Sequence, residues 1–332
     1  MKKKSIMILG GAGYIGTVTI EFFLKSNYRV TCIDNLLYGQ KNILKKFLKN
    51  KNFKFFNLDL RDTKKIEKIL SQETNVLILA GLVGDPITKK YKKLSHSINY
   101  TGIKNFILSC RQRESIKRLV FVSTCSNYGI GEKKLLSEKA KLKPLSYYSK
   151  QKVKIEKLLI NMKKISFTTT ILRFATAFGL SPRMRFDLTI NHFVKSLLDG
   201  ENLKIFDSET SRPYCHVLDF ARAIKKVFES KVEKIDREIF NVGDNKNNFS
   251  KKKIVDQISK YINQPKILYL KKGVDKRDYT VDFKKINKTL NFKTKYSVQF
   301  GIKEILNYVE KNNKIKKSLK NLGNFNISSD KL

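Results

Sequence analysis

The chain has 332 residues, and 69 lysine and arginine residues against 29 acidic ones give it a formal net charge of +40. No apolar run is long enough to span a bilayer, so a membrane protein is not expected. The basic excess is mostly lysine, spread along the whole chain without a nucleic-acid recognition module, which argues against a nucleic-acid partner. A basic nucleic-acid scaffold remains an alternative, and it would show strongly salt-dependent binding of generic DNA or RNA.

Apolar runs of strand length alternate with helical patterns through the first half of the chain. The predicted strands are Ser5–Leu9, Arg29–Ile33, Phe53–Asn57, Val76–Ala80 and Leu119–Ser123. The predicted helices between them are Tyr14–Lys25, Thr63–Leu70 and Asn99–Arg113. This alternation predicts an α/β fold, with helices on both faces of a doubly wound parallel sheet of the Rossmann type.

The pattern changes after a further helix at Tyr148–Met162 and a strand at Phe167–Phe174. We therefore predict a first domain over residues 1–174 and a smaller, mixed α/β substrate lobe over residues 175–310. Part of 215–245 is expected to fold back onto the first domain, and the polar tail 311–332 is expected to be frayed. The elements predicted after Phe174 are Asp187–Leu198, Leu203–Phe206, Asp219–Phe228, Ile239–Val242, Ile254–Ile262 and Ile302–Val309.

The four cysteines, Cys32, Cys110, Cys125 and Cys215, include no Cys-x-x-Cys pair, and no histidine cluster accompanies them. This spacing gives no support to a zinc site, and we expect no bound metal. Reduced thiols are typical of the cytosol, so we expect a cytoplasmic protein.

Glycines 10, 13 and 16 fall between the first predicted strand and the first helix. A glycine turn there lets the backbone approach a pyrophosphate, and the helix N-terminus favours its negative charge. The alternative is a tight strand–helix turn without a ligand. Asp34 ends the second strand, where a carboxylate accepts hydrogen bonds from ribose hydroxyls and repels a 2′-phosphate, so NAD is favoured over NADP. A plain turn-forming residue is the alternative for Asp34.

Tyr148 and Lys152 form a Tyr-x-x-x-Lys step and would share one face of a helix. A lysine ammonium beside a phenol lowers its pKa, which suits a general base that works near neutral pH. Because both residue types are abundant here, chance is the alternative for this motif alone. Thr124 follows the fifth strand and lies between the two motifs.

In their order and spacing, these motifs resemble the extended short-chain dehydrogenase/reductases of the nucleotide-sugar epimerase/dehydratase family, from about residue 4 to about residue 292. The resemblance implies Thr124, Tyr148 and Lys152 as catalytic residues and NAD as cofactor. The NAD-binding residues that it implies are Gly10, Gly13, Tyr14, Ile15, Gly16, Asp34, Asn35, Asp59, Leu60, Ala80, Gly81, Asn99 and Lys152.

The positions after Thr124 narrow the reaction within this resemblance. Family dehydratases usually place Asp-Glu there, and the sugar-acid decarboxylases usually have Glu at the second position, but this chain has Cys125 and Ser126. Serine is not a carboxylic acid, and Cys125 fits a small packed residue. We therefore expect an epimerase that inverts one carbon, C4 in our interpretation. A dehydratase, a dehydrogenase or reductase, and a non-enzymatic NAD-sensing regulator are the alternatives.

The resemblance also implies a nucleotide-diphosphate sugar as substrate. Arg212 and Arg277 lie in contexts like those of the family's diphosphate-binding arginines, and a surface ion pair is the alternative for each. The other implied substrate residues are Thr124, Thr176 and Asn191, with Arg183 and Arg185 as weaker candidates. In related enzymes the helices equivalent to Asn99–Arg113 and Tyr148–Met162 pair across a two-fold axis, which implies a homodimer.

Overall fold

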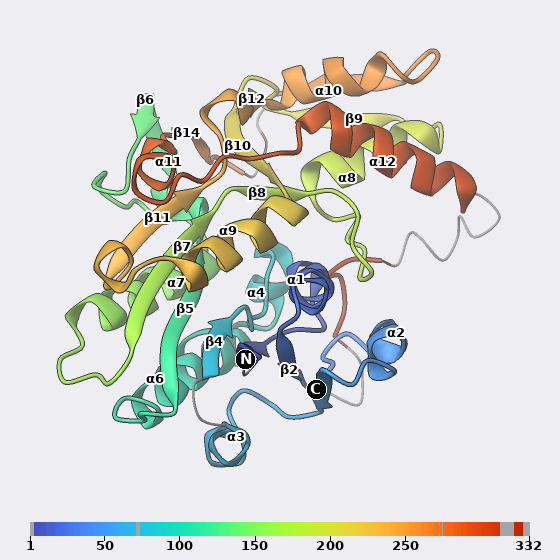
Figure 1. Cartoon of the computed structure of the whole chain (residues 1–332). Helices are drawn as coiled ribbons and strands as arrows, with labels where there is room; N and C mark the ends of the chain where they lie inside the picture. Colours follow the sequence, from blue (N-terminus) through green and yellow to red (C-terminus); the bar gives the residue numbers. More distant parts are fainter. Residues whose placement is uncertain (1–2, 71–73, 272, 274, 313–321, 328–332) are drawn as a thin grey trace.

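Seven parallel strands form the main sheet of the computed structural model (Figure 1). The structure describes residues 3–70, 74–271, 273, 275–312 and 322–327. The strand order is β11-β7-β5-β4-β1-β2-β3. The strands are β1 (Ser5–Leu9), β2 (Arg29–Ile33), β3 (Phe53–Phe56), β4 (Thr74–Ile78), β5 (Ile116–Thr124), β7 (Thr168–Phe174) and β11 (Glu238–Val242). The predicted Rossmann-type sheet is confirmed, with β4 shifted two residues toward the N-terminus.

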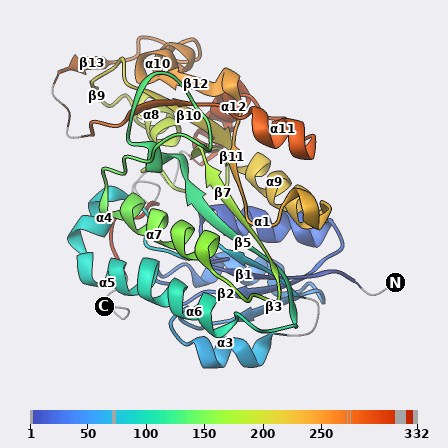
Figure 2. The same ribbon diagram turned by 90° about the vertical axis from the view of Figure 1, so that its left-hand side faces the viewer.

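Helices cover both faces of this sheet because its strands are apolar on both sides. Ile6 and Ile8 pack with the layer of α1 (Tyr14–Lys25) and α9 (Val217–Glu229). Met7 and Leu9 face the opposite layer. That layer contains α3 (Thr63–Ile69), α6 (Ile103–Ser109) and α7 (Tyr147–Asn161), as Figure 2 shows.

The predicted helix Asn99–Arg113 differs from the structure. The helical stretch begins earlier, with α4 (Asp85–Lys90) and α5 (Lys92–His96), and passes through a π-helical turn at Ser97–Gly102 before α6. Within this wide turn, the Asn99 carboxamide accepts from Leu82 N–H at 2.7 Å and donates to Leu82 O at 2.9 Å. The turn thereby ties this helix to the loop after β4.

Serine caps decide where three helices begin. The side chains of Ser146, Ser250 and Ser297 accept hydrogen bonds from backbone N–H groups three residues ahead. These caps satisfy free N–H groups of the first turn. The helices α10 (Lys251–Ser259) and α12 (Val298–Lys311) therefore start before the apolar periodicity that located them in the sequence.

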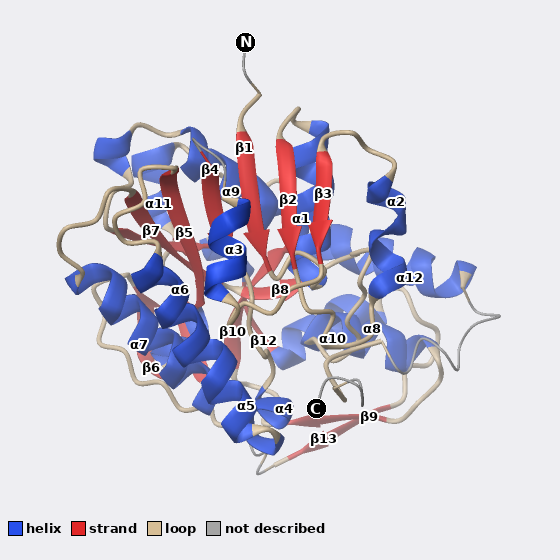
Figure 3. Cartoon of the chain, turned by 90° about the horizontal axis from the view of Figure 1, so that it is seen from below, coloured by secondary structure: helices blue, strands red, loops and turns tan. Residues whose placement is uncertain are grey.

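The second lobe lies beyond the carboxyl ends of the main strands, toward which the arrowheads of β1, β2 and β3 point in Figure 3. It contains three small sheets, of order β12-β10-β8, β13-β9 and β14-β6. Their strands are β6 (Ile130–Leu136), β8 (Thr176–Phe178), β9 (Leu203–Phe206), β10 (Ser211–His216), β12 (Asn248–Ser250), β13 (Ile267–Leu270) and β14 (Asp278–Val281). Across both lobes, the helices not yet named are α2 (Lys45–Leu48), α8 (Thr189–Leu198) and α11 (Lys284–Leu290). Short 3-10 turns lie at Lys41–Leu44, Cys125–Tyr128, Val232–Lys234 and Asn245–Asn247.

Two features bear on the lobe boundaries. Within residues 215–245, α9 packs on α1 and β11 pairs with β7 at the edge of the main sheet. The expectation of a frayed polar tail does not hold for Leu322–Ile327, because Asn324 and Ile327 are buried. Of the helices in the described part of the chain, none has the length and apolarity needed to cross a membrane.

Candidate active site

A cavity of about 540 Å³ lies where the ends of β1, β2, β4 and β5 meet the second lobe. Ligands of open α/β sheets bind at this edge, outside the carboxyl ends of the strands. Two residues implied by the resemblance, Asn99 and Asn191, are not among the lining residues. The predicted residues that line the cavity are Gly10, Gly13, Tyr14, Ile15, Gly16, Asp34, Asn35, Asp59, Leu60, Ala80, Gly81, Thr124, Tyr148, Lys152, Thr176, Arg212 and Arg277.

The glycine turn is shaped by close backbone contacts. Gly10 has a φ of +84°, and a Cβ there would lie 2.5 Å from the backbone nitrogen of Ala80. A Cβ on Gly16 would lie 2.6 Å from the carbonyl oxygens of Gly10 and Gly11. No side chain caps the start of α1, whose N-cap residue is Gly13. Its N-terminal N–H groups are therefore left to an anionic ligand such as a pyrophosphate.

Asp34 ends β2 and holds the surrounding loops. Its Oδ2 accepts from the Ala12 N–H at 3.0 Å, and its Oδ1 accepts from the Leu36 N–H at 2.8 Å. Burial raises the pKa of Asp34, and these two backbone hydrogen bonds partly offset that rise. A carboxylate in this position favours ribose hydroxyls over a 2′-phosphate.

Asp59 and Asn35 form the next part of this wall. The Asn35 Nδ2 donates to the Asp59 Oδ2 at 2.7 Å, and the Arg61 Nε donates to the Asp59 Oδ1 at 2.8 Å. Burial tends to raise the pKa of Asp59, but the hydrogen bonds from Arg61 outweigh it and hold this pKa below its usual value. Asp59 therefore stays an anion.

Asn99 and Asn191 lie outside the lining of the cavity, and their carboxamide groups hold the loops beside it. Asn99 is fully buried and holds Leu82, so it shapes the loop that carries Ala80 and Gly81. The Asn191 Oδ1 accepts from Gly179 N–H at 3.1 Å, and its Nδ2 donates to Arg185 O at 2.9 Å. Their amide groups are thus used inside the protein.

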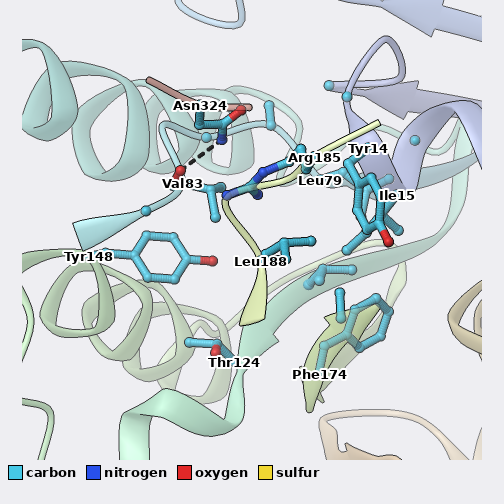
Figure 4. A pocket seen from close by; sticks show the side chains of 18 of the residues that line it. Tyr14, Ile15, Leu79, Val83, Thr124, Tyr148, Phe174, Arg185, Leu188 and Asn324 are labelled. Carbon is cyan, nitrogen blue, oxygen red and sulfur yellow. Dashed lines mark hydrogen bonds between the residues drawn. The ribbon is translucent and has the colours of Figure 1, made fainter. Parts of the chain in front are cut away.

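The catalytic candidates come from β5 and α7. Tyr148 lies in the first turn of α7, and its ring extends into the cavity on the side where Thr124 lies (Figure 4). The Thr124 Oγ1 accepts from the Ser126 N–H at 3.1 Å. Lys152 lies one turn beyond Tyr148, donates to the Val122 carbonyl oxygen at 2.8 Å, and has its Nζ 5.7 Å from the Tyr148 ring centroid.

Burial dominates the ionisation of this pair. Burial raises the pKa of Tyr148. The nearby charges have smaller effects on this pKa: Arg185 lowers it and Asp85 raises it. Burial also lowers the pKa of Lys152 from 10.5 to about 7, against the opposing effect of Glu156. The expected net lowering of the Tyr148 pKa by Lys152 is therefore not found, because desolvation disfavours both charged forms.

A buried hydrogen-bond network supports α7 behind the catalytic side chains. The Arg173 Nη2 on β7 lies 2.7 Å from the Glu156 Oε2, and both side chains are almost fully buried. The Asn127 Nδ2 donates to the Glu156 Oε1 at 2.8 Å, and the Ser123 hydroxyl donates to the same oxygen. This network ties α7 to the end of β5, where Thr124 stands.

The two residues after Thr124 offer no acid to the cavity. Cys125 is fully buried, donates to the Arg173 carbonyl oxygen at 3.3 Å, and has a pKa raised by burial. The Ser126 hydroxyl lies 3.2 Å from the Tyr279 hydroxyl and accepts from the Arg277 Nη1 at 3.4 Å. Of the two, only Ser126 lines the cavity.

The two predicted diphosphate arginines meet at one carboxylate. Asp275 accepts from Arg212 Nη2 at 2.8 Å and from Arg277 Nη2 at 2.7 Å. The Arg277 Nη2 also lies 2.8 Å from the Asp85 Oδ2. Both guanidinium groups line the cavity, so a substrate phosphate would share them with, or take them from, Asp275.

Several lining residues were missed or ranked low in the sequence. Arg183 and Arg185, two residues apart after the Gly179 loop, both line the cavity, and Arg183 stacks 4.6 Å from the Tyr38 ring centroid. Arg185 pairs with Asp187, its Nε donating to Oδ1 at 3.0 Å. The spacing of Arg183 and Arg185, which puts both side chains on one side of an extended segment, was the signal in the sequence that they line one site. The missed lining residues are Tyr38, Asp85, Asp187, Asp275, Asn324 and Phe325, among others.

Comparison with known proteins now identifies the family. Residues 6–243 match the model of the NAD dependent epimerase/dehydratase family. The chain belongs to this family. It is 29% identical over 331 residues to the UDP-glucuronate 4-epimerase of Thermodesulfobacterium geofontis, covering 95% of this chain and 98% of that protein. It is 27% identical over 323 residues to UDP-arabinose 4-epimerase 1 of Arabidopsis thaliana, covering 88% and 76% of the two.

Solved structures of this family are similar over nearly the whole chain. The UDP-glucose 4-epimerase of Thermotoga maritima with UDP-glucose superposes with a TM-score of 0.79 at 25% identity, covering 92% of this chain and 99% of that one. The UDP-glucuronic acid 4-epimerase of Bacillus cereus, in complex with UDP-glucuronic acid and NAD, has a TM-score of 0.80 at 23% identity with the same coverage. The likeness to the Bacillus cereus structure shows that the two proteins share a fold.

NAD is the cofactor of this family, and the cavity fits it. The glycine turn and the uncapped start of α1 suit a pyrophosphate, and Asp34 suits a ribose. In the described part of the chain, no three His, Cys, Asp or Glu side chains gather as metal ligands would.

The low pKa of Lys152 predicts a pH-dependent stability. Because this pKa is about 7 in the folded protein against an ordinary value of 10.5, the unfolded chain binds more protons between those pH values. Stability should therefore rise with pH across this window by up to about 1.4 kcal/mol per pH unit, relative to a Lys152→Met variant. Below pH 7 the difference between the two proteins should be constant.

Urea unfolding at pH 6, 7, 8 and 9 measures the difference in the free energy of unfolding between the wild type and Lys152→Met. This range stays below the pH at which alkali damages proteins. Lys154→Met, which removes an exposed lysine from the same helix, is the matched control and should run parallel to the wild type. Parallel curves for Lys152→Met and the wild type from pH 7 to 9 would show that Lys152 is charged throughout.

Proposed function

We propose that the protein is an NAD-dependent epimerase that inverts C4 of a nucleoside-diphosphate sugar through a transient keto-sugar. The observation that carries the proposal is the cavity itself. Tyr148 and Thr124 line it beside the glycine turn and Asp34, and neither position after Thr124 holds a carboxylic acid. This constellation supports oxidation and reduction at one sugar carbon more than removal of water.

The roles of the side chains follow from their chemistry. Thr124 holds the reacting sugar hydroxyl by a hydrogen bond. Tyr148 takes the hydroxyl proton as the carbon becomes a ketone, and it returns the proton when the ketone is reduced on its opposite face. Bound NAD supplies the reversible hydride acceptor. Arg185 favours the anionic form of Tyr148 against the effect of burial. Lys152, one turn further along α7, holds the ribose of NAD in our proposal.

The substrate class is supported by the arginines and by the relatives. Arg212 and Arg277 line the cavity and suit bidentate contact with a diphosphate, while Thr176 lies near the sugar end in our proposal. Solved relatives hold UDP-glucose and UDP-glucuronic acid. Uridine diphosphate sugars are therefore the first substrates to test.

Two further properties belong to the proposal. We propose a homodimer in which α6 and α7 of two copies pack as a four-helix bundle, because Leu108 and Ile160 on these helices are each 39% exposed. We also place the protein in the cytoplasm, because Cys32, Cys110, Cys125 and Cys215 are all free thiols.

The mechanism predicts the behaviour of a Tyr148→Phe variant. It should retain NAD but lose about 10²- to 10⁴-fold in turnover, the usual contribution of general acid–base catalysis. Turnover is followed by NMR of the NAD-loaded enzyme with UDP-glucose, UDP-glucuronic acid and UDP-pentoses. Tyr147→Phe, on the neighbouring position of α7, is the control and should keep its activity. Turnover by Tyr148→Phe at the wild-type rate would refute the site.

The products of the same incubation separate the alternatives. A C4 epimer with no net change in NAD supports the proposal. Accumulation of a dehydrated keto-sugar would identify a dehydratase, and NADH formed in step with product would identify a dehydrogenase. Tight NAD binding without turnover of any sugar would favour an NAD-sensing regulator.

Asp34 predicts the choice of cofactor. Calorimetric titration should show tighter binding of NAD than of NADP, because the Asp34 carboxylate repels a 2′-phosphate. Asp34→Ala should narrow this preference, although it also removes the acceptor for the Ala12 and Leu36 N–H groups. Asp62→Ala, at an exposed acid nearby, should leave the preference unchanged. Tighter binding of NADP by the wild type would contradict the assignment.

The dimer predicts an effect of charge on exposed apolar positions of α6 and α7. Light scattering should give a dimer mass for the wild type at micromolar concentration and a monomer mass for Leu108→Asp/Ile160→Asp, because burying two carboxylates at an interface is costly. Leu268→Asp, at an exposed position on β13, is the control and should remain dimeric. A monomeric wild type would refute the proposal.

A further inference from the structure

The last described segment of the chain, Leu322–Ile327, contacts both lobes at the edge of the cavity. On the second lobe, Phe186 N–H donates to Leu322 O at 2.8 Å, and Arg183 Nη2 donates to Gly323 O at 3.4 Å. On the first domain, the Asn324 Nδ2 donates to the Val83 carbonyl oxygen at 2.7 Å, the dashed line in Figure 4. The segment therefore bridges the two walls of the site.

An apolar contact anchors the end of this segment on the cofactor side. Ile327 is only 6% exposed and belongs to a small apolar cluster apart from the larger cores. Burial of such an apolar side chain stabilises its position. The other buried members of the cluster are Leu37, Leu82, Ile87 and Ile98.

The loops that hold this cluster also carry cofactor residues. Leu37 follows Asp34 and Asn35 after β2, and Leu82 follows Ala80 and Gly81 after β4. The anchor of the segment thus rests on the two loops that line the predicted NAD site.

Asn324 has one side-chain group without a partner. The side chain is 8% exposed and lines the cavity, and its Nδ2 is used by Val83. Its Oδ1 is buried and has no hydrogen-bond partner among the described residues. A buried acceptor without a hydrogen-bond partner is unfavourable, because it has lost its bonds to water. A carboxamide oxygen accepts hydrogen bonds, so the ligand group that matches it is a donor such as a hydroxyl.

We propose that Leu322–Ile327 is a strap across the cofactor site, in which Asn324 Oδ1 accepts a hydrogen bond from a ribose hydroxyl of NAD. The strap slows the release of NAD, since the cofactor leaves faster when these contacts are broken. The inference deepens the proposed function and rests on it, because an epimerase has to keep its cofactor between the oxidation and the reduction.

The strap predicts faster NAD release when its contacts are removed. Protein loaded with radiolabelled NAD is chased with excess unlabelled NAD, without any sugar, and the label retained is followed over time. Asn324→Ala should release NAD about 5- to 10-fold faster, as the loss of one hydrogen bond to a ligand predicts. Ile327→Asp should release NAD at least as fast as Asn324→Ala does. Asn326→Ala, an exposed asparagine of the same segment, is the matched control and should match the wild type.

A second measurement uses only the unmodified chain. If the strap holds NAD, then NAD holds the strap, because coupling between two binding events is reciprocal. Hydrogen exchange of the backbone N–H groups of Leu322–Ile327 should therefore slow when NAD is added.

Three results would overturn the strap. The first is a wild-type release rate of NAD in both Asn324→Ala and Ile327→Asp, and the second is hydrogen exchange in Leu322–Ile327 that NAD does not change. The third is faster loss of sugar substrate with unaltered NAD release, since the segment would then act on the sugar. None of these results depends on turnover, so a strap that fails leaves the epimerase proposal standing, and a protein that holds NAD by the strap without epimerising sugars refutes the epimerase alone.

Discussion

The buried ion pair between Glu156 and Arg173 is the contact on which the catalytic arrangement depends. It joins α7 to β7, and through Ser123 and Asn127 it reaches the end of β5 and the turn after it. Tyr148 and Lys152 precede Glu156 on α7, and Thr124 follows Ser123, so one network sets the spacing of all three. Removing one partner would leave an uncompensated charge in the interior, which typically costs about 3–5 kcal/mol.

Burial, more than net charge, sets the electrostatics of the site. The +40 charge comes from lysines along the whole chain, whereas the cations that line the cavity are few and mostly paired. Arg185 pairs with Asp187, and Arg212 and Arg277 share Asp275. Such pairs hold guanidinium groups in place before a substrate arrives, which reduces the reorganisation that its binding requires. Within the described part of the chain Lys152 forms no ion pair with a carboxylate, and burial lowers its pKa to about 7.

Contacts across the lobes give the cavity its second wall. The Tyr14 hydroxyl at the start of α1 donates to Gly179 O at 2.5 Å, and Asn191 Nδ2 donates to the same hydroxyl at 3.2 Å. The glycine turn is therefore linked directly to the loop that leads to Arg183 and Arg185. The segment Leu322–Ile327 makes a second bridge at the other side of the cavity. Cofactor and sugar sites are thus parts of one bridged cleft.

Local pattern in the sequence was enough to predict the parallel sheet, and most of the site residues predicted from its motifs and from the family resemblance line the cavity. These motifs, the glycine turn, Asp34 and the Tyr-x-x-x-Lys step, depend only on residues close in sequence. One tight turn or one turn of helix is enough to bring their side chains together. The tertiary structure alone showed that Asn99 and Asn191 hold loops, that Tyr148 has a raised pKa, and that Asn324 reaches the cavity. Burial and contact between distant segments depend on how the whole chain packs, and neither residue spacing nor composition contains that information.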